Sequence, residues 1–211
     1  KGNPNLNPEE SYQLDAGIHW GNDRLTIQFD PYLNYFPNYI YMNPTPNYYE
    51  GLQWYYYTQS RVIRCGFELQ ADWKILPSLS AEFKGEYLYA EQLSGEKKGY
   101  TLPFSTPWSA DATLRYAFCR KNVGNEGFVA MNMHVTGRQN NIVPPEKPTP
   151  GYYTLNLTAG KDFAFGERTL RLSLNAENLL NRKYYAHTSF YRLIDVPEPG
   201  RNVALMATFE F

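Results

Sequence analysis

RNVALMATFEF, residues 201–211, alternates apolar with polar or small side chains along nearly all of its length. The apolar positions are Val203, Leu205, Ala207, Phe209 and Phe211. A period of two residues is the pattern of a β-strand, because successive side chains point to opposite faces of a sheet. The stretch therefore predicts a strand with one apolar face, and its length is close to the ~9–11 residues of a strand that crosses a bilayer.

The same alternation recurs in eight earlier segments, and most of them run for about nine to twelve residues. These segments are 11–20, 24–35, 63–74, 79–89, 108–118, 129–136, 153–160 and 169–177. No stretch keeps the i, i+3, i+4, i+7 pattern of an amphipathic helix with caps at both ends. The sequence therefore predicts an all-β protein, an antiparallel up-and-down meander of about nine long strands.

The connections between these segments alternate in length. Short or modest turns are expected at 21–23, 76–78, 119–127 and 165–168. Long connections are expected at 36–61, 91–107, 139–152 and 180–202, and they hold most of the prolines. Short turns on one side and long loops on the other are typical of outer-membrane β-barrels, in which the long loops are extracellular.

Composition excludes membrane helices but not membrane strands. The mean hydropathy is -0.56, and no apolar run approaches the ~20 residues that a spanning helix needs. Charged side chains on the polar face of the early strands suit a water-filled lumen. The alternative is a large soluble β-sandwich, which gives the same alternation in any single strand. The net charge of -1 argues against nucleic acid as a partner.

Aromatic residues gather at both ends of the predicted strands. At the short-turn end these are Trp20, Trp73, Phe118, Phe163 and Phe211. At the long-loop end they are Tyr35, Tyr89, Trp108 and Tyr153. Two such girdles bracket the lipid-facing band of a barrel. Nine strands is an odd number, whereas bacterial single-chain barrels have an even one, so we expect N-terminal strands to be missing from the chain.

Several stretches resemble the TonB-dependent outer-membrane receptors, which import ferric siderophores, cobalamin, copper or glycans. The resemblance is carried by NPNLNPEESYQLDAGIHW (3–20), NYIYMNPTP (38–46), WYYYTQSRVIRCGFELQADWKI (54–75), TLRLSLNAENLLNRKYYAH (169–187) and PEPGRNVALMATFEF (197–211). The last two resemble the C-terminal signature of the family, which ends in Phe. The likeness covers essentially the whole chain in the order of the family.

The resemblance implies that residues 1–211 are the C-terminal portion of a transmembrane barrel that has 22 strands in this family. It implies a Gram-negative outer-membrane location and a ligand such as a ferric siderophore. The implied partners are the plug domain and earlier strands of the parent receptor, TonB acting through the absent N-terminus, outer-membrane lipid and the small-molecule ligand. No cofactor is implied. A terminal Phe211 would be read by the outer-membrane assembly machinery.

Nothing in the sequence points to an enzyme or a metal centre. Asp15 and His19 share a face, but four residues of strand separate them by about 13 Å. Asp111 stands between small residues, and His134 has no serine or carboxylate two positions away. We therefore predict no catalytic residues and no metal ligands. Cys65 and Cys119 are predicted to be free thiols.

The candidate ligand contacts are aromatic and charged residues of the expected external loops. The connection 36–61 supplies Tyr41, Tyr48, Tyr49, Trp54 and Tyr55, and the last long connection supplies His187, Tyr191 and Arg192. Tyrosine and tryptophan offer rigid contact area with a polar tip, which suits an aromatic siderophore or a sugar. Two alternatives stay open: these aromatics pack within the girdle and hairpins, and Arg192 either pairs with an anionic chelate or braces its loop. The alternative function is a soluble or porin-like β-domain that binds carbohydrate.

Overall fold

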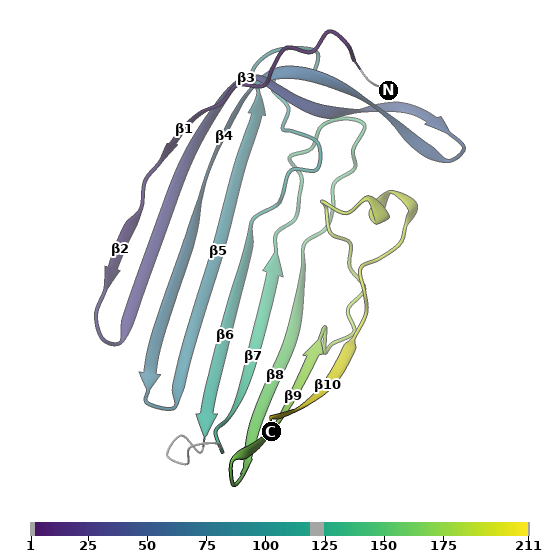
Figure 1. The fold of residues 1–211 in the computed structure, drawn as a ribbon. Coiled ribbons are helices and arrows are strands. Elements are labelled where there is room, and N and C mark those ends of the chain that lie inside the picture. The colour runs from purple at the N-terminus through teal and green to yellow at the C-terminus, as the bar shows by residue number, and fades with distance from the viewer. Residues whose placement is uncertain (1–2, 119–124, 211) are drawn as a thin grey trace.

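The computed structural model describes residues 3–118 and 125–210, and these form one antiparallel sheet that is curved but not closed (Figure 1). The strands follow one another in chain order across the sheet, which confirms the predicted all-β meander. Their bounds are β1 Tyr12–Asp15, β2 Ile18–Gly21, β3 Leu25–Tyr49, β4 Leu52–Leu76, β5 Leu79–Gln92, β6 Ser109–Phe118, β7 Gly127–Thr136, β8 Tyr152–Phe165, β9 Arg168–Glu177 and β10 Asn202–Glu210.

The strands β1 and β2 are two halves of the single strand predicted at 11–20. Both pair with β3 in one unbroken register, from Tyr12 opposite Tyr35 to Gly21 opposite Thr26. The interruption falls at Ala16, whose amide donates to the Pro31 carbonyl at 3.1 Å. Pro31 has no N–H to return that bond, so the ladder is broken there without a shift of register. The sheet thus has nine strand positions, as predicted.

The predicted external loop 36–61 is instead a continuation of the sheet. β3 runs on to Tyr49 and β4 starts at Leu52, so the actual turn is Glu50 and Gly51, both with positive φ. Period two fails as a signal here because the register shifts between Phe36 and Tyr39 and again between Pro44 and Tyr48. Such bulges absorb the prolines and change which face later residues take.

The other connections have the predicted lengths. Residues 22–24, 77–78 and 166–167 are short turns at one end of the sheet, and the turn between β6 and β7 lies mostly outside the described residues. Residues 93–108, 137–151 and 178–201 are long loops at the opposite end (Figure 1). The last of them contains a 3-10 helix, η1 Phe190–Ile194. Within the described residues no helix is long and apolar enough to cross a membrane.

Each strand separates an apolar face from a polar face, and no second layer formed by the described residues covers the apolar one. Leu14, Leu114 and Leu205 on this face are 69%, 50% and 75% exposed. The predicted girdle residues Trp20, Trp73 and Trp108 are exposed on it as well. Phe211 lies outside the described residues. An exposed apolar face of this size indicates that the sheet is stable only in an apolar environment. Burial of apolar surface is the main favourable contribution to the free energy of folding.

The polar face carries rows of hydrogen-bonded side chains from neighbouring strands. Contrary to the sequence expectation, Asp111 is not isolated: its carboxylate contacts His134 Nδ1 at 3.0 Å, and His134 Nε2 contacts the Thr136 hydroxyl at 2.9 Å. Asp111 and His134 are direct cross-strand partners in β6 and β7. Cys65 is a free thiol as predicted, and Cys119 is outside the described residues.

A small core lies at the long-loop end of the sheet. Val62, Ala90 and Leu102 are buried together, and Phe36, Tyr39 and Tyr41 pack against them. This core pins the loop 93–108 onto β3–β5. The fully buried Gln92 completes it, because its amide accepts from the Tyr41 hydroxyl at 2.6 Å and donates to the Thr101 carbonyl at 2.7 Å.

Candidate ligand-binding site

The long loops and the far end of the β3–β4 hairpin, residues 39–60, form one unit that we call the loop cap; its loops are 93–108, 137–151 and 178–201. The cap encloses a cavity of about 600 Å³. The hairpin lines it with Tyr48, Gly51, Leu52, Gln53 and Tyr55. The loops line it with Pro145, Glu146, Lys147, Pro148, Thr149, Pro150, Tyr185, Phe190, Tyr191, Arg192, Leu193, Ile194 and Asp195.

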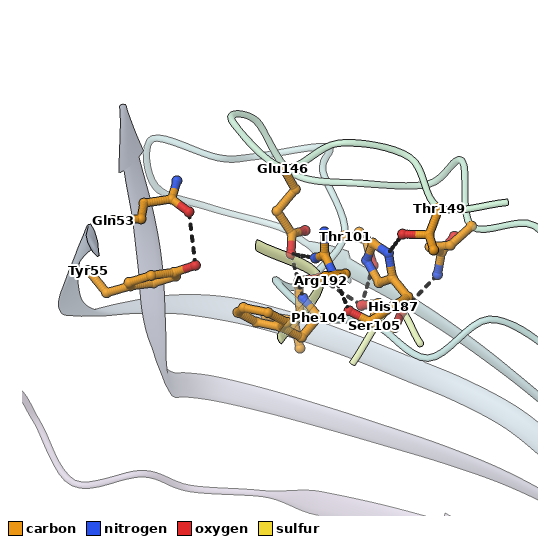
Figure 2. Close-up of polar contacts among 11 residues, drawn as sticks. Gln53, Tyr55, Thr101, Phe104, Ser105, Glu146, Thr149, His187 and Arg192 are labelled. Atoms are coloured by element: carbon orange, nitrogen blue, oxygen red, sulfur yellow. Dashed lines mark hydrogen bonds and ion pairs between the residues drawn. The ribbon is translucent and has the colours of Figure 1, made fainter. Parts of the chain in front are cut away.

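A buried ion pair joins the three loops of the cap. Arg192 Nη2 donates to Glu146 Oε1 at 3.0 Å, and the two side chains are only 7% and 3% exposed. The same carboxylate oxygen accepts the Phe104 amide at 3.0 Å, and Arg192 Nε donates to the His187 carbonyl at 2.6 Å (Figure 2). Burial raises the pKa of Glu146 despite the favourable arginine and amide contacts. Such a pair is costly to break because either partner alone would be a buried charge.

His187 is the second buried polar group of the cap. It is 2% exposed, and its Nδ1 contacts the Thr149 hydroxyl at 2.7 Å. Its Nε2 is buried without a hydrogen bond among the described residues. Burial, with a smaller contribution from the nearby Arg192 charge, lowers the pKa of His187 to about 4. At neutral pH this imidazole is therefore uncharged and acts as a hydrogen-bonded brace between two loops.

Aromatic rings fill the space between the hairpin and the loops. Tyr55 of β4 contacts Phe104 and Phe190, with ring centroids 6.1 and 6.2 Å away, and Phe104 and Phe190 are 4.5 Å apart. Phe190 opens η1, where the Ser189 side chain caps the Tyr191 amide. Because the three rings come from three separate segments, their contacts fix the shape of the cavity wall.

Comparison with known proteins identifies this architecture. A family model described as TonB dependent receptor-like, beta-barrel matches residues 1–179. The chain belongs to this family. The match confirms the resemblance seen in the sequence. Members of the family are transporters of the Gram-negative outer membrane and not enzymes, in agreement with the prediction that this chain is not an enzyme.

Solved structures of TonB-dependent receptors share the fold of this barrel segment. The copper transporter OprC aligns with a TM-score of 0.78 and 19% identity over 95% of this chain. The FrpB iron transporter from Neisseria meningitidis aligns with 0.70 and 15% over 95%, and the ferric yersiniabactin uptake receptor FyuA from Yersinia pestis with 0.62 and 16% over 96%. The aligned region is 31%, 30% and 28% of those chains, so this chain spans less than a third of their length.

The receptor fold brings four of the eight candidate ligand contacts together. Tyr48, Tyr55, Tyr191 and Arg192 line the cavity. His187 braces the loops through its Thr149 contact and is not in the lining. The other three point elsewhere: Tyr49 and Trp54 contact each other on the hairpin, with centroids 6.4 Å apart, and Tyr41 belongs to the small core.

Some residues that shape the site carry no signal in the receptor sequence. Glu146 sits in a proline-rich stretch that reads as an ordinary loop, and Phe104 lies 42 residues before it. Nothing in the sequence distinguishes Phe190 from the neighbouring, more polar Tyr191. The prolines at 144, 145, 148 and 150 are a signal that could have indicated a restrained loop, because proline fixes its own φ.

The chemistry of the cavity follows from these contacts. Arg192 donates to Glu146 and to the His187 carbonyl, so in this structure the arginine braces its loop. What remains available to a ligand is aromatic rings, proline rings and tyrosine hydroxyls, together with the exposed side chains of Lys147 and Asp195. Among residues 3–118 and 125–210, no cluster of histidine, cysteine and carboxylate side chains could hold a metal ion. The cavity therefore suits a ligand that presents flat or apolar surfaces and a few hydrogen-bonding groups.

Proposed function

We propose that this chain is the C-terminal barrel portion of a Gram-negative outer-membrane receptor that imports a small-molecule ligand, such as a ferric siderophore, in a TonB-dependent manner. The observation that carries the proposal is the aromatic cavity of about 600 Å³ in the loop cap. It lies at the long-loop end of the sheet, which is the extracellular end in this type of barrel. Its volume falls in the range of small-molecule sites.

The open sheet supports the membrane part of the proposal. The apolar face has the exposed leucines and aromatic girdles that lipid would cover, and β5–β9 are ten to fourteen residues long. The edges β1/β2 and β10 each lack a partner among the described strands. In the proposed receptor these edges pair with further strands of the barrel, and a plug domain that contacts TonB fills the lumen.

The transported ligand is inferred from the site and from similar proteins together. The three aligned transporters are named for copper, iron and ferric yersiniabactin. In the cap of this chain, Tyr48 and Tyr191 are 67% and 64% exposed, so their rings are available to stack on a bound ligand. Glu146, Arg192 and His187 hold the loop that presents Tyr191, and β3 presents Tyr48. An aromatic metal chelate fits such a cavity better than a bare ion does.

Two neighbouring tyrosines provide a matched test. Tyr48 and Tyr49 follow one another at the hairpin tip and are similarly exposed, but only Tyr48 lines the cavity. In the complete receptor, Tyr48→Ala is expected to lower uptake of radiolabelled iron from a ferric catecholate by about tenfold at limiting concentration, because loss of one stacking ring costs ~1–1.5 kcal/mol. Tyr49→Ala, at an equal surface level of receptor, is expected to transport normally. Equal uptake by both variants and the wild type would refute the cap cavity as the ligand site.

A further inference from the structure

Two arginines stand apart from the others in this chain. Among the described arginines, only Arg64 and Arg192 are partly buried, and the rest are exposed. Arg192 has a carboxylate partner, Glu146. Arg64 lies on the polar face of β4, opposite Asn34 of β3 and Ala90 of β5. The comparison with Arg192 raises the question of what Arg64 pairs with.

Arg64 has no partner within residues 3–118 and 125–210. Its guanidinium makes no hydrogen bond, ion pair or cation–π contact there, and its Nε atom is buried without an acceptor. An unpaired, partly buried arginine is unfavourable, since the lost hydration of the charge is not compensated. A buried arginine donor without an acceptor indicates a place where a further hydrogen-bond acceptor is bound.

The space beside Arg64 is large enough for such a group. Arg64 lines a hollow of about 390 Å³ between the strand wall and the loop 93–108. Tyr39, Tyr57 and Phe104 line the same hollow. The tyrosine hydroxyls of Tyr39 and Tyr57 make no hydrogen bond within the described part of the chain, so both can donate to a ligand. An arginine and two hydroxyl donors around one space form a set suited to an anionic oxygen group.

Two acidic side chains share a hollow with Arg64 without pairing with it. Glu68 and Glu86 share with it a smaller hollow of about 200 Å³ but form no ion pair with it. Gly66 lies between Arg64 and Glu68 on this face of β4, and the Tyr32 ring covers it: a Cβ on Gly66 would lie 2.6 Å from the Tyr32 hydroxyl. Tyr32 thus lies close to the arginine and to both carboxylates, and Arg64 also lines the larger hollow of about 390 Å³.

We propose that Arg64 is an anion-binding residue in the lumen wall, and that it receives an oxyanion, such as a carboxylate, carried by the ligand that enters beneath the cap. The arginine fork matches a carboxylate or phosphate in a bidentate arrangement. The inference rests on the proposed function for the source of the anion. It also divides recognition in two, because the aromatic rings of the cap cavity contact the flat surface of the ligand while Arg64 binds its negative charge.

Citrate and inorganic phosphate are suitable probes, and calorimetric titration of the complete receptor in detergent at low salt is the measurement. Citrate represents an organic carboxylate, and phosphate represents a free inorganic anion. Arg64→Gln is expected to weaken the binding of citrate at least tenfold, since a hydrogen-bonded charge pair contributes about that much. The citrate affinity of Arg64→Lys is expected to lie between those of the wild type and Arg64→Gln, because lysine keeps the positive charge but cannot make the bidentate contact of a guanidinium. Arg61→Gln removes the same charge from an exposed position of β4 and is the matched control.

The outcomes separate this inference from its competitors. Tighter binding of citrate than of phosphate through Arg64 assigns the site to an organic ligand, and equal binding assigns it to any small oxyanion; both support an anion site. Unchanged titrations with Arg64→Gln would overturn it. So would a wild-type receptor that binds neither anion but melts at a lower temperature with Arg64→Gln, which would assign Arg64 to a protein carboxylate. Calorimetry does not require transport, so a receptor that binds citrate through Arg64 yet imports nothing would refute only the proposed function.

Discussion

The loop cap and the strand wall below it, which is the polar face of the sheet and includes Arg64, differ in whether their buried charges are paired. In the cap, Arg192 is paired with Glu146 and braced against the His187 carbonyl. In the wall, Arg64 has no partner among the described residues. The cap uses its polar groups to hold loops in place, and this gives aromatic rings a fixed position. The wall leaves a charged group available. The difference shows that a charged residue near a cavity indicates ligand binding only after its protein partners have been counted.

The largest expected effect comes from breaking the ion pair of the cap. Glu146→Ala leaves the Arg192 charge buried and removes the acceptor of the Phe104 amide, so the cap is expected to lose about 3–5 kcal/mol of local stability. Amide hydrogen exchange of the loops in the complete receptor measures this. The double variant Glu146→Gln with Arg192→Met removes both charges and should recover much of the loss. A single variant as stable as the wild type would show that the pair does not hold the cap.

Lowering the pH is the next test, and the direction of the expected change in cap stability follows from the pKa of His187. The pKa of His187 is lowered to about 4 in the fold from an ordinary value near 6.5, so the unfolded loop binds the proton more readily. The stability from neutral His187 is complete above about pH 6.5 and is lost as the pH falls toward 4, by at most ~3 kcal/mol.

The groups that face His187 set the control for this measurement. Arg192 disfavours its protonation, and Glu146, whose pKa is raised by burial, has the opposite linkage and stabilises the fold more once protonated. The difference between wild type and His187→Asn in hydrogen exchange, corrected for the intrinsic rate at each pH, isolates the histidine. Parallel pH profiles for the two proteins would contradict the assignment.

Gly66 tests how tightly the strand wall is packed beside Arg64. A Cβ on Gly66 would clash with the Tyr87 carbonyl oxygen, so Gly66→Ala should destabilise the barrel by about 1–3 kcal/mol and displace Tyr32. Denaturant unfolding of the receptor measures the loss. Gly85→Ala on the neighbouring strand would meet only the Phe83 ring edge at 3.3 Å and should cost less. Equal losses at both glycines would mean that the packing around Arg64 has no special constraint.

The smallest effect is expected from an exposed ion pair of the wall. Arg171 contacts Asp162 at 2.9 Å, but about half of its side chain is in solvent. Because exposed pairs gain little over hydration, Arg171→Ala should leave the midpoint of unfolding unchanged within error. A loss comparable to that of Glu146→Ala would remove the distinction between cap and wall.

The sequence predicts the strands because alternation depends only on nearest neighbours, and segments 79–89 and 169–177 fall inside β5 and β9. It fails at 36–61, where bulges around Pro37 and Pro44 break the period while the ladder continues. The sequence also does not predict which side chains of neighbouring strands lie opposite each other, because this depends on the register of the strands. Asp111 and His134 are 23 residues apart, and only the alignment of β6 with β7 makes them neighbours.

The candidate site was predictable in composition and not in arrangement. Tyrosine-rich loops indicate a contact surface, and four of the eight chosen residues do line the cavity. Which tyrosine faces it depends on the bulges of β3, so Tyr48 and Tyr49 are indistinguishable in the sequence. The role of Arg192 depends on Glu146, which lies 46 residues earlier in another loop. Side-chain pairing between loops has no periodic signal.

The central claim is that the cap is a preformed structure whose loops are held by buried polar contacts. Amide hydrogen exchange of Phe104, Gln139 and Thr149 in the ligand-free receptor tests it most directly, because these amides donate to Glu146, Thr149 and Gln139 respectively. We predict exchange at least about a hundredfold slower than in an open loop. Exchange of all three at the rate of an unstructured chain would contradict the account.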